Sequence, residues 1–177
     1  MSEPKEGGQN ASDSTEEREL FPVRIRTADE GDVPFIFKSW LLSYQGQNKH
    51  IPAAVIHEYE PAKIQRMLNE NVTIMLVGDT DASAGDIYGF CCAQRVAGTL
   101  VVYFIYVKAS FRKWGFAKAM LNAFDYKRGE VIFHPYNFYL KRDLRQRGYN
   151  MMFVPYLKDL TKNEWETFYE NNRASIE

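Results

Sequence analysis

Residues 23–26 alternate between apolar and polar with the two-residue period that is typical of β-strands, and further short apolar runs follow along the chain. The run 99–107 is apolar at nearly every position, which indicates a central strand covered on both faces. Ala97 and Gly98 separate it from the run 87–96 and predict a tight hairpin turn. Strands are expected at residues 23–26, 72–77, 87–96, 99–107, 131–134 and 151–154.

Between the strands, apolar residues recur at spacings of three and four and predict amphipathic helices. Asp32 and Pro34 favour one helix start, as N-cap and first-turn proline, and Pro61 favours another. Gly148 favours the end of a later helix. Helices are expected at residues 33–44, 61–69, 116–124, 138–147 and 162–173. This alternation of strands and helices predicts a fold of the α/β class.

The length of 177 residues suits one folded domain, which we expect at residues 20–177. Residues 1–19 are polar and lack apolar periodicity, so they are expected to form a disordered tail. Their six acidic and two basic residues give a charge of −4; the whole chain carries −1, so residues 20–177 carry +3. A mildly basic domain suits an anionic cofactor, but this charge is too small to indicate nucleic acid by itself.

Two adjacent residues, Cys91 and Cys92, are the only cysteines of the chain. Neighbours on a strand point to opposite faces, so the two thiols are not expected to form a disulfide. The sequence therefore predicts neither a disulfide framework nor a metal site, and a reducing, cytoplasmic location is expected. No apolar run reaches the length of a membrane-spanning helix, so no membrane partner is expected.

A short basic turn separates the apolar strand that ends at Val107 from the next helical pattern. Gly115 stands where this helix is expected to begin, and helix starts carry backbone N–H groups without partners in the helix. The small residues Gly115 and Ala117 leave room for an anion to approach these groups. Arg112 adds a positive charge nearby. The turn is therefore interpreted as a phosphate-binding site.

The segment Arg112-x-x-Gly115-x-Ala117 resembles the acetyl-CoA-binding motif of the GNAT N-acetyltransferase superfamily, which reads Gln/Arg-x-x-Gly-x-Gly/Ala. Its context, a strand before it and an apolar helix after it, also matches, although Ala109 replaces the proline of many members. The resemblance covers roughly residues 23–154. It implies a GNAT-like fold with a central, mostly antiparallel mixed sheet and helices on both faces. This chain would add a C-terminal helix where the family usually has a further strand.

The resemblance also implies the ligands and their contacts. Acetyl-CoA would be the co-substrate, and an amine on a small molecule or a protein would be the acceptor. Ile105 and Val107 would offer backbone groups to the pantetheine arm, while Asn137 would contact the cofactor or simply cap a helix. The turn would bind the pyrophosphate through Arg112, Lys113, Trp114, Gly115, Phe116 and Ala117.

The groups that would move protons are less clear in the sequence. The family often uses a tyrosine to protonate the leaving thiolate, and here that position is Leu144. Tyr139 and Tyr136 are nearby hydroxyls that could replace it. Strand 99–107 carries no acid, so His134, at the end of the next strand, becomes the candidate base. The alternatives are a histidine held by local hydrogen bonds, a positioned water, or a base among His50, His57, Glu58 and Glu60.

Three functions fit these observations. An acetyl-CoA-dependent N-acetyltransferase is the first. The second is a protein of the same fold that modifies or binds a macromolecule, such as a nucleic-acid base, through a basic run formed by Lys141, Arg142, Arg145 and Arg147. The third is a non-catalytic module that binds CoA or a partner. A homodimer is one way to cover the end of the sheet, where the further strand is missing.

Overall fold

The computed structural model describes residues 23–78, 85–135, 140–155, 163–164, 166–168 and 170–171. The predicted tail at residues 1–19 lies outside the described residues, as do Tyr136, Asn137 and Tyr139. Residues 163–164, 166–168 and 170–171 are helical, which agrees with the expected C-terminal helix.

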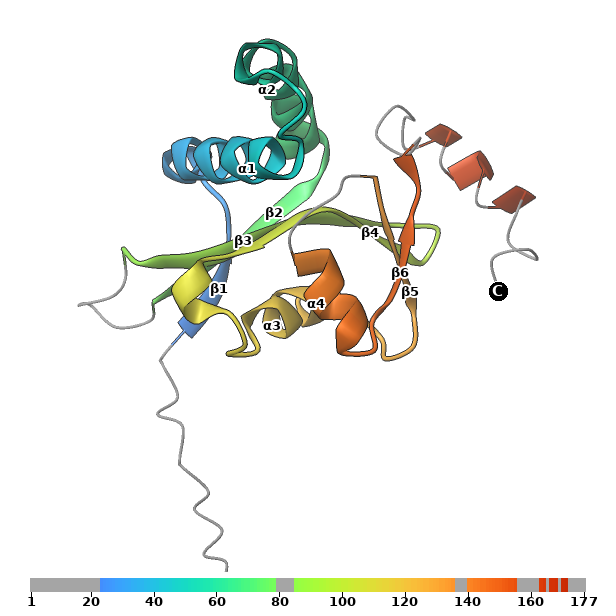
Figure 1. Cartoon of the computed structure of the whole chain (residues 1–177). Helices are drawn as coiled ribbons and strands as arrows, with labels where there is room; N and C mark the ends of the chain where they lie inside the picture. Colours follow the sequence, from blue (N-terminus) through green and yellow to red (C-terminus); the bar gives the residue numbers. More distant parts are fainter. Residues whose placement is uncertain are drawn as a thin grey trace, which may run out of the picture.

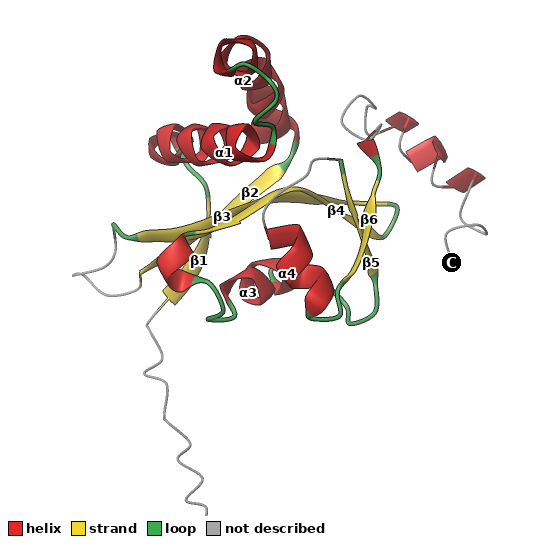
Figure 2. Ribbon diagram, viewed as in Figure 1, coloured by secondary structure: helices red, strands yellow, loops and turns green. Residues whose placement is uncertain are grey.

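One six-stranded sheet forms the centre of the molecule, with the strands in the order of the sequence (Figures 1 and 2). The first four strands pair antiparallel, and the β4–β5 and β5–β6 pairs are parallel. The strands are β1 (Val23–Thr27), β2 (Val72–Gly78), β3 (Ile87–Val96), β4 (Thr99–Val107), β5 (Val131–His134) and β6 (Asn150–Phe153). The predicted mixed, mostly antiparallel sheet is confirmed.

Helices cover both faces of this sheet, as Figure 1 shows: α1 and α2 on one face, α3 and α4 on the other. Their bounds are α1 (Val33–Gln47), α2 (Ala53–Glu70), α3 (Phe116–Asn122) and α4 (Leu140–Gln146), with short 3-10 turns at η1 (Glu30–Asp32) and η2 (Ala109–Phe111). Two covered faces explain why β4 is apolar at almost every position. The expected α/β class is therefore confirmed.

Aromatic rings fix α1 on the sheet. Trp40 stacks on Phe104 of β4 with a centroid distance of 4.4 Å. Nearer the start of the helix, the Phe35 ring lies edge to face with the rings of Phe90 and Tyr106, at centroid distances of 6.2 and 6.1 Å. Since Phe35 contacts the end of β4 and Trp40 contacts a residue nearer its start, α1 runs antiparallel to β4.

Several local predictions differ from the structure. The helix expected to begin at Pro61 begins at Ala53 and contains Pro61 in its interior. One buried face continues through the helix on both sides of Pro61, and its packing offsets the loss of the hydrogen bond that proline removes. The buried residues are Ile56, Glu60, Ile64 and Met67. Asp32 does not cap α1 with its side chain but binds Arg26, with a 2.8 Å bond from Nη2 to Oδ1. The helix after Gly115 ends at Asn122 rather than Phe124.

The backbone of β4 leaves no room for a side chain at Gly89 of β3. A Cβ added there would lie 2.3 Å from the carbonyl oxygen of Tyr106, which belongs to the backbone and has no room to move. We expect Gly89→Ala to lower the free energy of unfolding by about 1–3 kcal/mol or more. Gly85→Ala is the matched control, because a Cβ there meets nothing within 4 Å. Urea unfolding of both variants checks this, and equal stabilities would contradict it.

Candidate functional site

The site begins where strands β4 and β5 part. Only two residue pairs join them, Leu100 with Ile132 and Val101 with Phe133. Beyond these pairs β5 ends at His134, while β4 continues to Val107. Residues 102–107 therefore form a strand edge that β5 does not cover. A wedge opens between the strands toward the carboxyl end of β4, at the place expected for the cofactor.

A β-bulge lies directly at this opening. Cys92 pairs with Phe104 and Ala93 pairs with Val102, so Tyr103 is an extra residue in β4. Bulges bend a strand and increase its twist, which fits the divergence of β4 from β5. Gln94 donates a 2.6 Å hydrogen bond to the Tyr103 hydroxyl. Burial raises the pKa of this phenol to about 12, so it stays protonated near neutral pH.

Backbone groups on the open edge of β4 follow from the register of the ladder. The N–H of Lys108 donates to the carbonyl of Tyr88 at 2.9 Å, so this residue points its polar groups toward β3. In an antiparallel ladder the direction alternates from one residue to the next. Val107 and Ile105 therefore point their N–H and C=O groups away from β3, into the wedge. The Nε of Arg112 reaches the Val107 carbonyl at 3.4 Å, which agrees with this direction.

Arg95, near the end of β3, fixes the closed end of the wedge. Its guanidinium donates to both carboxylate oxygens of Glu130, at 2.7 and 2.9 Å, just before β5 begins. The same group donates to the carbonyls of Gly98, Phe124 and Asp125. The β3–β4 turn, the end of the α3 segment and the start of β5 are thus held by one side chain. The two strands stay together here and part only at the other end.

The loop from Arg112 to Gly115 has an unusual backbone. The φ angle is −68° at Arg112, 73° at Lys113 and 85° at Gly115. The positive φ angles at Lys113 and Gly115 turn the chain sharply within three residues. A Cβ at Gly115 would meet nothing within 4 Å, so the positive φ, rather than a lack of space, is what favours glycine here. With seven residues, α3 adds little dipole of its own.

Two adjoining cavities lie between this loop, α3 and the end of α4. They share four lining residues, Gly115, Lys118, Arg147 and Tyr149. The inner cavity, of about 40 Å³, also meets Val107, Leu144 and Ala117; the outer one has a volume of about 540 Å³. Five basic residues line the two: Arg112, Lys113, Lys118, Arg128 and Arg147. Asp143 is the one acid among the described lining residues, so the cavities favour an anion.

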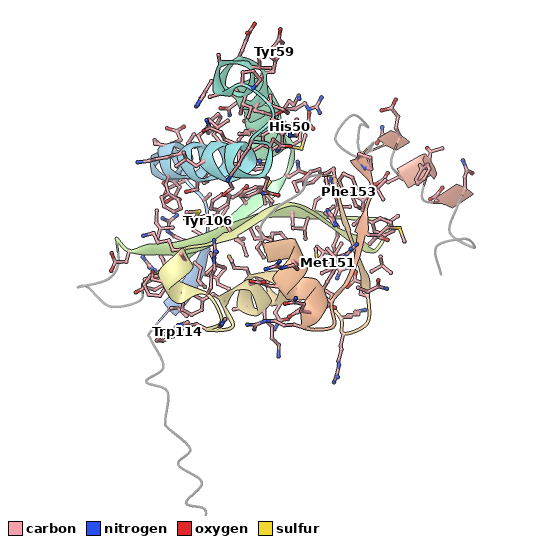
Figure 3. The ribbon with its side chains drawn as sticks, viewed as in Figure 1. His50, Tyr59, Tyr106, Trp114, Met151 and Phe153 are labelled. Atoms are coloured by element: carbon pink, nitrogen blue, oxygen red, sulfur yellow. The ribbon has the colours of Figure 1, made fainter. Side chains whose placement is uncertain are left out.

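Other residues of the predicted turn lie differently. Phe116 and Ala117 line the inner cavity, whereas Trp114 is 46% exposed and lines neither cavity. Figure 3 shows Trp114 on the α3 side of the sheet, on the opposite side from Tyr106. The side chain of Ile105 is core, so its contribution to the wedge is its backbone.

The candidate proton-transfer groups lie in different surroundings. Leu144 lies in the wall of the inner cavity, so the position at which the resemblance implies a tyrosine is apolar here. His134 lies at the parting of the strands, as the sequence suggested, and its ring is 5.4 Å from that of Phe153. Its side chain is fully buried, and it lines neither of the two cavities. Tyr139 and Asn137 belong to the undescribed part of the chain.

The basic run at 141–147 does not present one uniform face. Arg145 donates a 2.6 Å hydrogen bond to the carbonyl of Met151, and Arg147 lines both cavities. Arg142 is exposed. Two of these cations are therefore committed to the fold or to the cavities. Within the described residues no cluster of His, Cys, Asp or Glu could hold a metal ion, and no helix there is long and apolar enough to cross a membrane.

Parts of this site left little trace in the sequence. The bulge at Tyr103 lies in an apolar run, where an extra residue does not disturb any visible alternation. Tyr149 and Arg128 join the cavity walls from loops that are distant in sequence from the motif. The Arg95–Glu130 pair joins residues 35 apart. Arg147 was visible in the basic run, yet its sequence context did not indicate the cavity.

Glu130 should make a pH-dependent contribution to stability. Burial raises the pKa of its carboxyl, but the hydrogen bonds from Arg95 and Lys127 outweigh this, so its pKa is below the ordinary value of 4.5. A lowered pKa stabilises the folded state above pH 4.5, and this stabilisation disappears as the pH falls through the folded-state pKa. We expect Glu130→Gln to cost about 1–3 kcal/mol at pH 7.

Urea unfolding of wild type and Glu130→Gln across the acid range checks this. The difference between them should shrink as the pH falls below about 4.5. Glu58→Gln, on the exposed surface of α2, is the control and should change little at any pH. A difference that stays constant down to pH 2 would contradict the role of the carboxylate charge.

No family model and no curated protein matches the chain. Solved structures to which it is similar are acetyltransferases. A candidate acetyl transferase of Pyrococcus furiosus is 15% identical, with a TM-score of 0.49 over 75% of this chain and 95% of that one. A GNAT-family acetyltransferase of Staphylococcus aureus Mu50 is 14% identical, with a TM-score of 0.41 over 58% and 62%. AAC(6')-Iy, bound to a CoA-containing bisubstrate analogue, is 16% identical, with a TM-score of 0.36 over 86% and 88%.

Proposed function

We propose that this protein is an acetyl-CoA-dependent N-acetyltransferase of the GNAT type. The observation that carries the proposal is the uncovered edge of β4, which leads from the bulge at Tyr103 to the cationic loop at 112–117. An extended ligand with amide groups can bond to such an edge as an added strand would. A ligand with phosphates at its far end would place them at the loop. Acetyl-CoA has both features.

Different residues of the chain would bind different parts of acetyl-CoA. Backbone N–H groups of residues 113–117 and the guanidinium of Arg112 would bind the pyrophosphate. Ile105 and Val107 would offer N–H and C=O groups to the pantetheine arm. Arg128 and Arg147, in the outer cavity, would meet the remaining phosphate charge. Binding of this kind fixes the thioester near the bulge, where the strands begin to part.

Acetyl transfer then requires a neutral amine beside the thioester. The amine nitrogen forms the bond to the acetyl carbon, the carbon–sulfur bond breaks, and the sulfur leaves with its electron pair. The proton that the amine loses goes to a base or to water, and the thiolate takes up a proton. His134 is the titratable side chain at the strand parting, and it would act through a water because it is fully buried. Leu144 has no proton to give.

A second candidate function is a module that binds CoA or a partner without catalysis. The specific observation in its favour is the combination of a buried His134 and an apolar Leu144 beside the cavity. Turnover with any amine would exclude this function. We also infer a reducing, cytoplasmic location, because the thiols of Cys91 and Cys92 are both free and fully buried.

Gly115→Asp is expected to weaken CoA binding by about a hundredfold or more, because it places a carboxylate where the pyrophosphate would lie. Gly115→Ala separates the effect of the added charge on CoA binding from the effect of backbone strain. It retains only the cost of a side chain at a φ of 85°, about 1–2 kcal/mol, and should bind CoA better than the Asp variant. Gly85→Asp is the control for an added acid on the surface. Calorimetry with CoA measures all three, and a Gly115→Asp variant with wild-type affinity would refute the phosphate site.

His134→Gln tests the base. We expect a lower kcat, with the acidic limb of the pH–rate profile removed and CoA affinity nearly unchanged, because the loop lies at the other end of the wedge. Steady-state rates across pH 5–9 and calorimetry provide these numbers. Wild-type rates at every pH would show that His134 is only part of the core, and the acceptor of the proton would then be a water or a side chain of the segment 46–60.

A further inference from the structure

A third hollow lies on the α1 side of the sheet, on the opposite face from the cationic cavities. Its volume is about 360 Å³, within the range of small-molecule sites. Phe35 and Tyr106 form its aromatic floor, and Figure 3 shows Tyr106 on this side, below α1. We call it the α1 groove. It rests against the same uncovered strand, β4, that borders the wedge.

Arg112 joins the α1 groove to the proposed cofactor site. Its side chain lines both the inner cavity and the groove. Because β5 does not cover residues 102–107, the edge of β4 separates the two hollows without a further strand between them. A ligand in the α1 groove would thus meet the thioester across this edge. If the protein is an acetyltransferase, the groove is the place for the acceptor.

The two ends of the α1 groove lie at different distances from the bulge, because α1 runs antiparallel to β4. Phe35 lies over Tyr106 and Trp40 over Phe104, so Ser43, almost one turn further, lies level with the bulge. Ser43 is buried and lines the groove. From Lys38 to Ser43 the helix rises by about 7–8 Å. The end of the groove at Ser43 is therefore the end nearest the reacting thioester.

The other end of the α1 groove is positively charged. Lys38 and Arg112 both line the α1 groove, and no acidic residue is among its described lining residues. A third cation, the Nζ of Lys108, lies 5.6 Å from the centre of the Phe35 ring. A cationic acceptor such as a polyamine would be repelled here, whereas a carboxylate or phosphate would be attracted.

We propose, on the basis of the proposed function, that the acceptor is a small amine that carries an anionic group. The anion binds between Lys38 and Arg112, and the amine lies at the Ser43 end, roughly 7–8 Å away, the helix rise between the two ends. The flexible chain between them crosses the floor formed by Phe35 and Tyr106. The anion is a carboxylate or a phosphate monoester; both offer oxygens to guanidinium and ammonium groups.

A matched set of amines tests this assignment. 6-Aminohexanoate and 4-aminobutyl phosphate carry an anion at this separation, and 6-aminohexanamide is the neutral analogue. With acetyl-CoA, the anionic amines should have a kcat/KM at least about tenfold above that of the amide. The better of the two anions identifies the natural head group. Equal values for the amide and both anionic amines would overturn the proposal.

Lys38→Glu should abolish or invert this preference and leave CoA affinity unchanged, because Lys38 lies outside the cofactor cavities. Arg24→Glu makes the same change of charge on the exposed surface of the edge strand β1 and should keep the preference. A preference that survives Lys38→Glu would overturn the assignment of the anion site.

Calorimetry of 6-aminohexanoate and its amide against the CoA-bound protein gives a second readout that needs no turnover. The carboxylate should bind more tightly than the amide in wild type, and only Lys38→Glu should remove the difference. Equal binding of the two would refute the anion site even if acetylation is observed. If CoA itself does not bind the wild type, the proposed function fails instead, so the two failures are distinguishable.

Discussion

The hydrogen bonds of Arg95 determine how the two halves of the sheet meet. β4 and β5 are joined by only two residue pairs. Arg95 adds a two-bond contact to Glu130 and three bonds to backbone carbonyls of the surrounding turns. This fixes the closed end of the wedge, and the bulge at Tyr103 directs β4 away from β5 beyond it. The edge of β4 is uncovered because the wedge is held at one end and open at the other.

The two proposed binding regions lie on the two faces of β4, on either side of this edge. Side chains of β4 point alternately to the α1 side and the α3 side, as Tyr106 and Val107 show. The cationic loop continues from the end of β4 on one side, and α1 lies over it on the other. Arg112 follows the strand and reaches both faces. A short segment of chain would thus serve both of the proposed ligands.

Much of the framework could be predicted from local pattern. The strands Ile87–Val96, Thr99–Val107 and Val131–His134 have the predicted bounds, because hairpin and proline signals flank apolar runs. The prediction for Pro61 was wrong because the buried stripe of α2 continues across the proline. The bulge at Tyr103 and the α1 groove depend on pairing and packing between distant segments, which a single sequence does not encode in any local period. The motif at Arg112 was visible, whereas nothing in the sequence indicated that Arg128 and Arg147 line the adjoining cavity.

The parallel pairing of β5 to β4 has a consequence for the order of folding. Strands β2, β3 and β4 form a meander through short connections, so their contacts close small loops. β5 reaches β4 only through the crossover that contains α3, and its contacts therefore cost more chain entropy before they stabilise the fold. The meander is expected to form early and the β5–β6 pair to dock late. The wedge is then created in the last step of folding, and it is the part of the molecule whose local opening a bound ligand would suppress most.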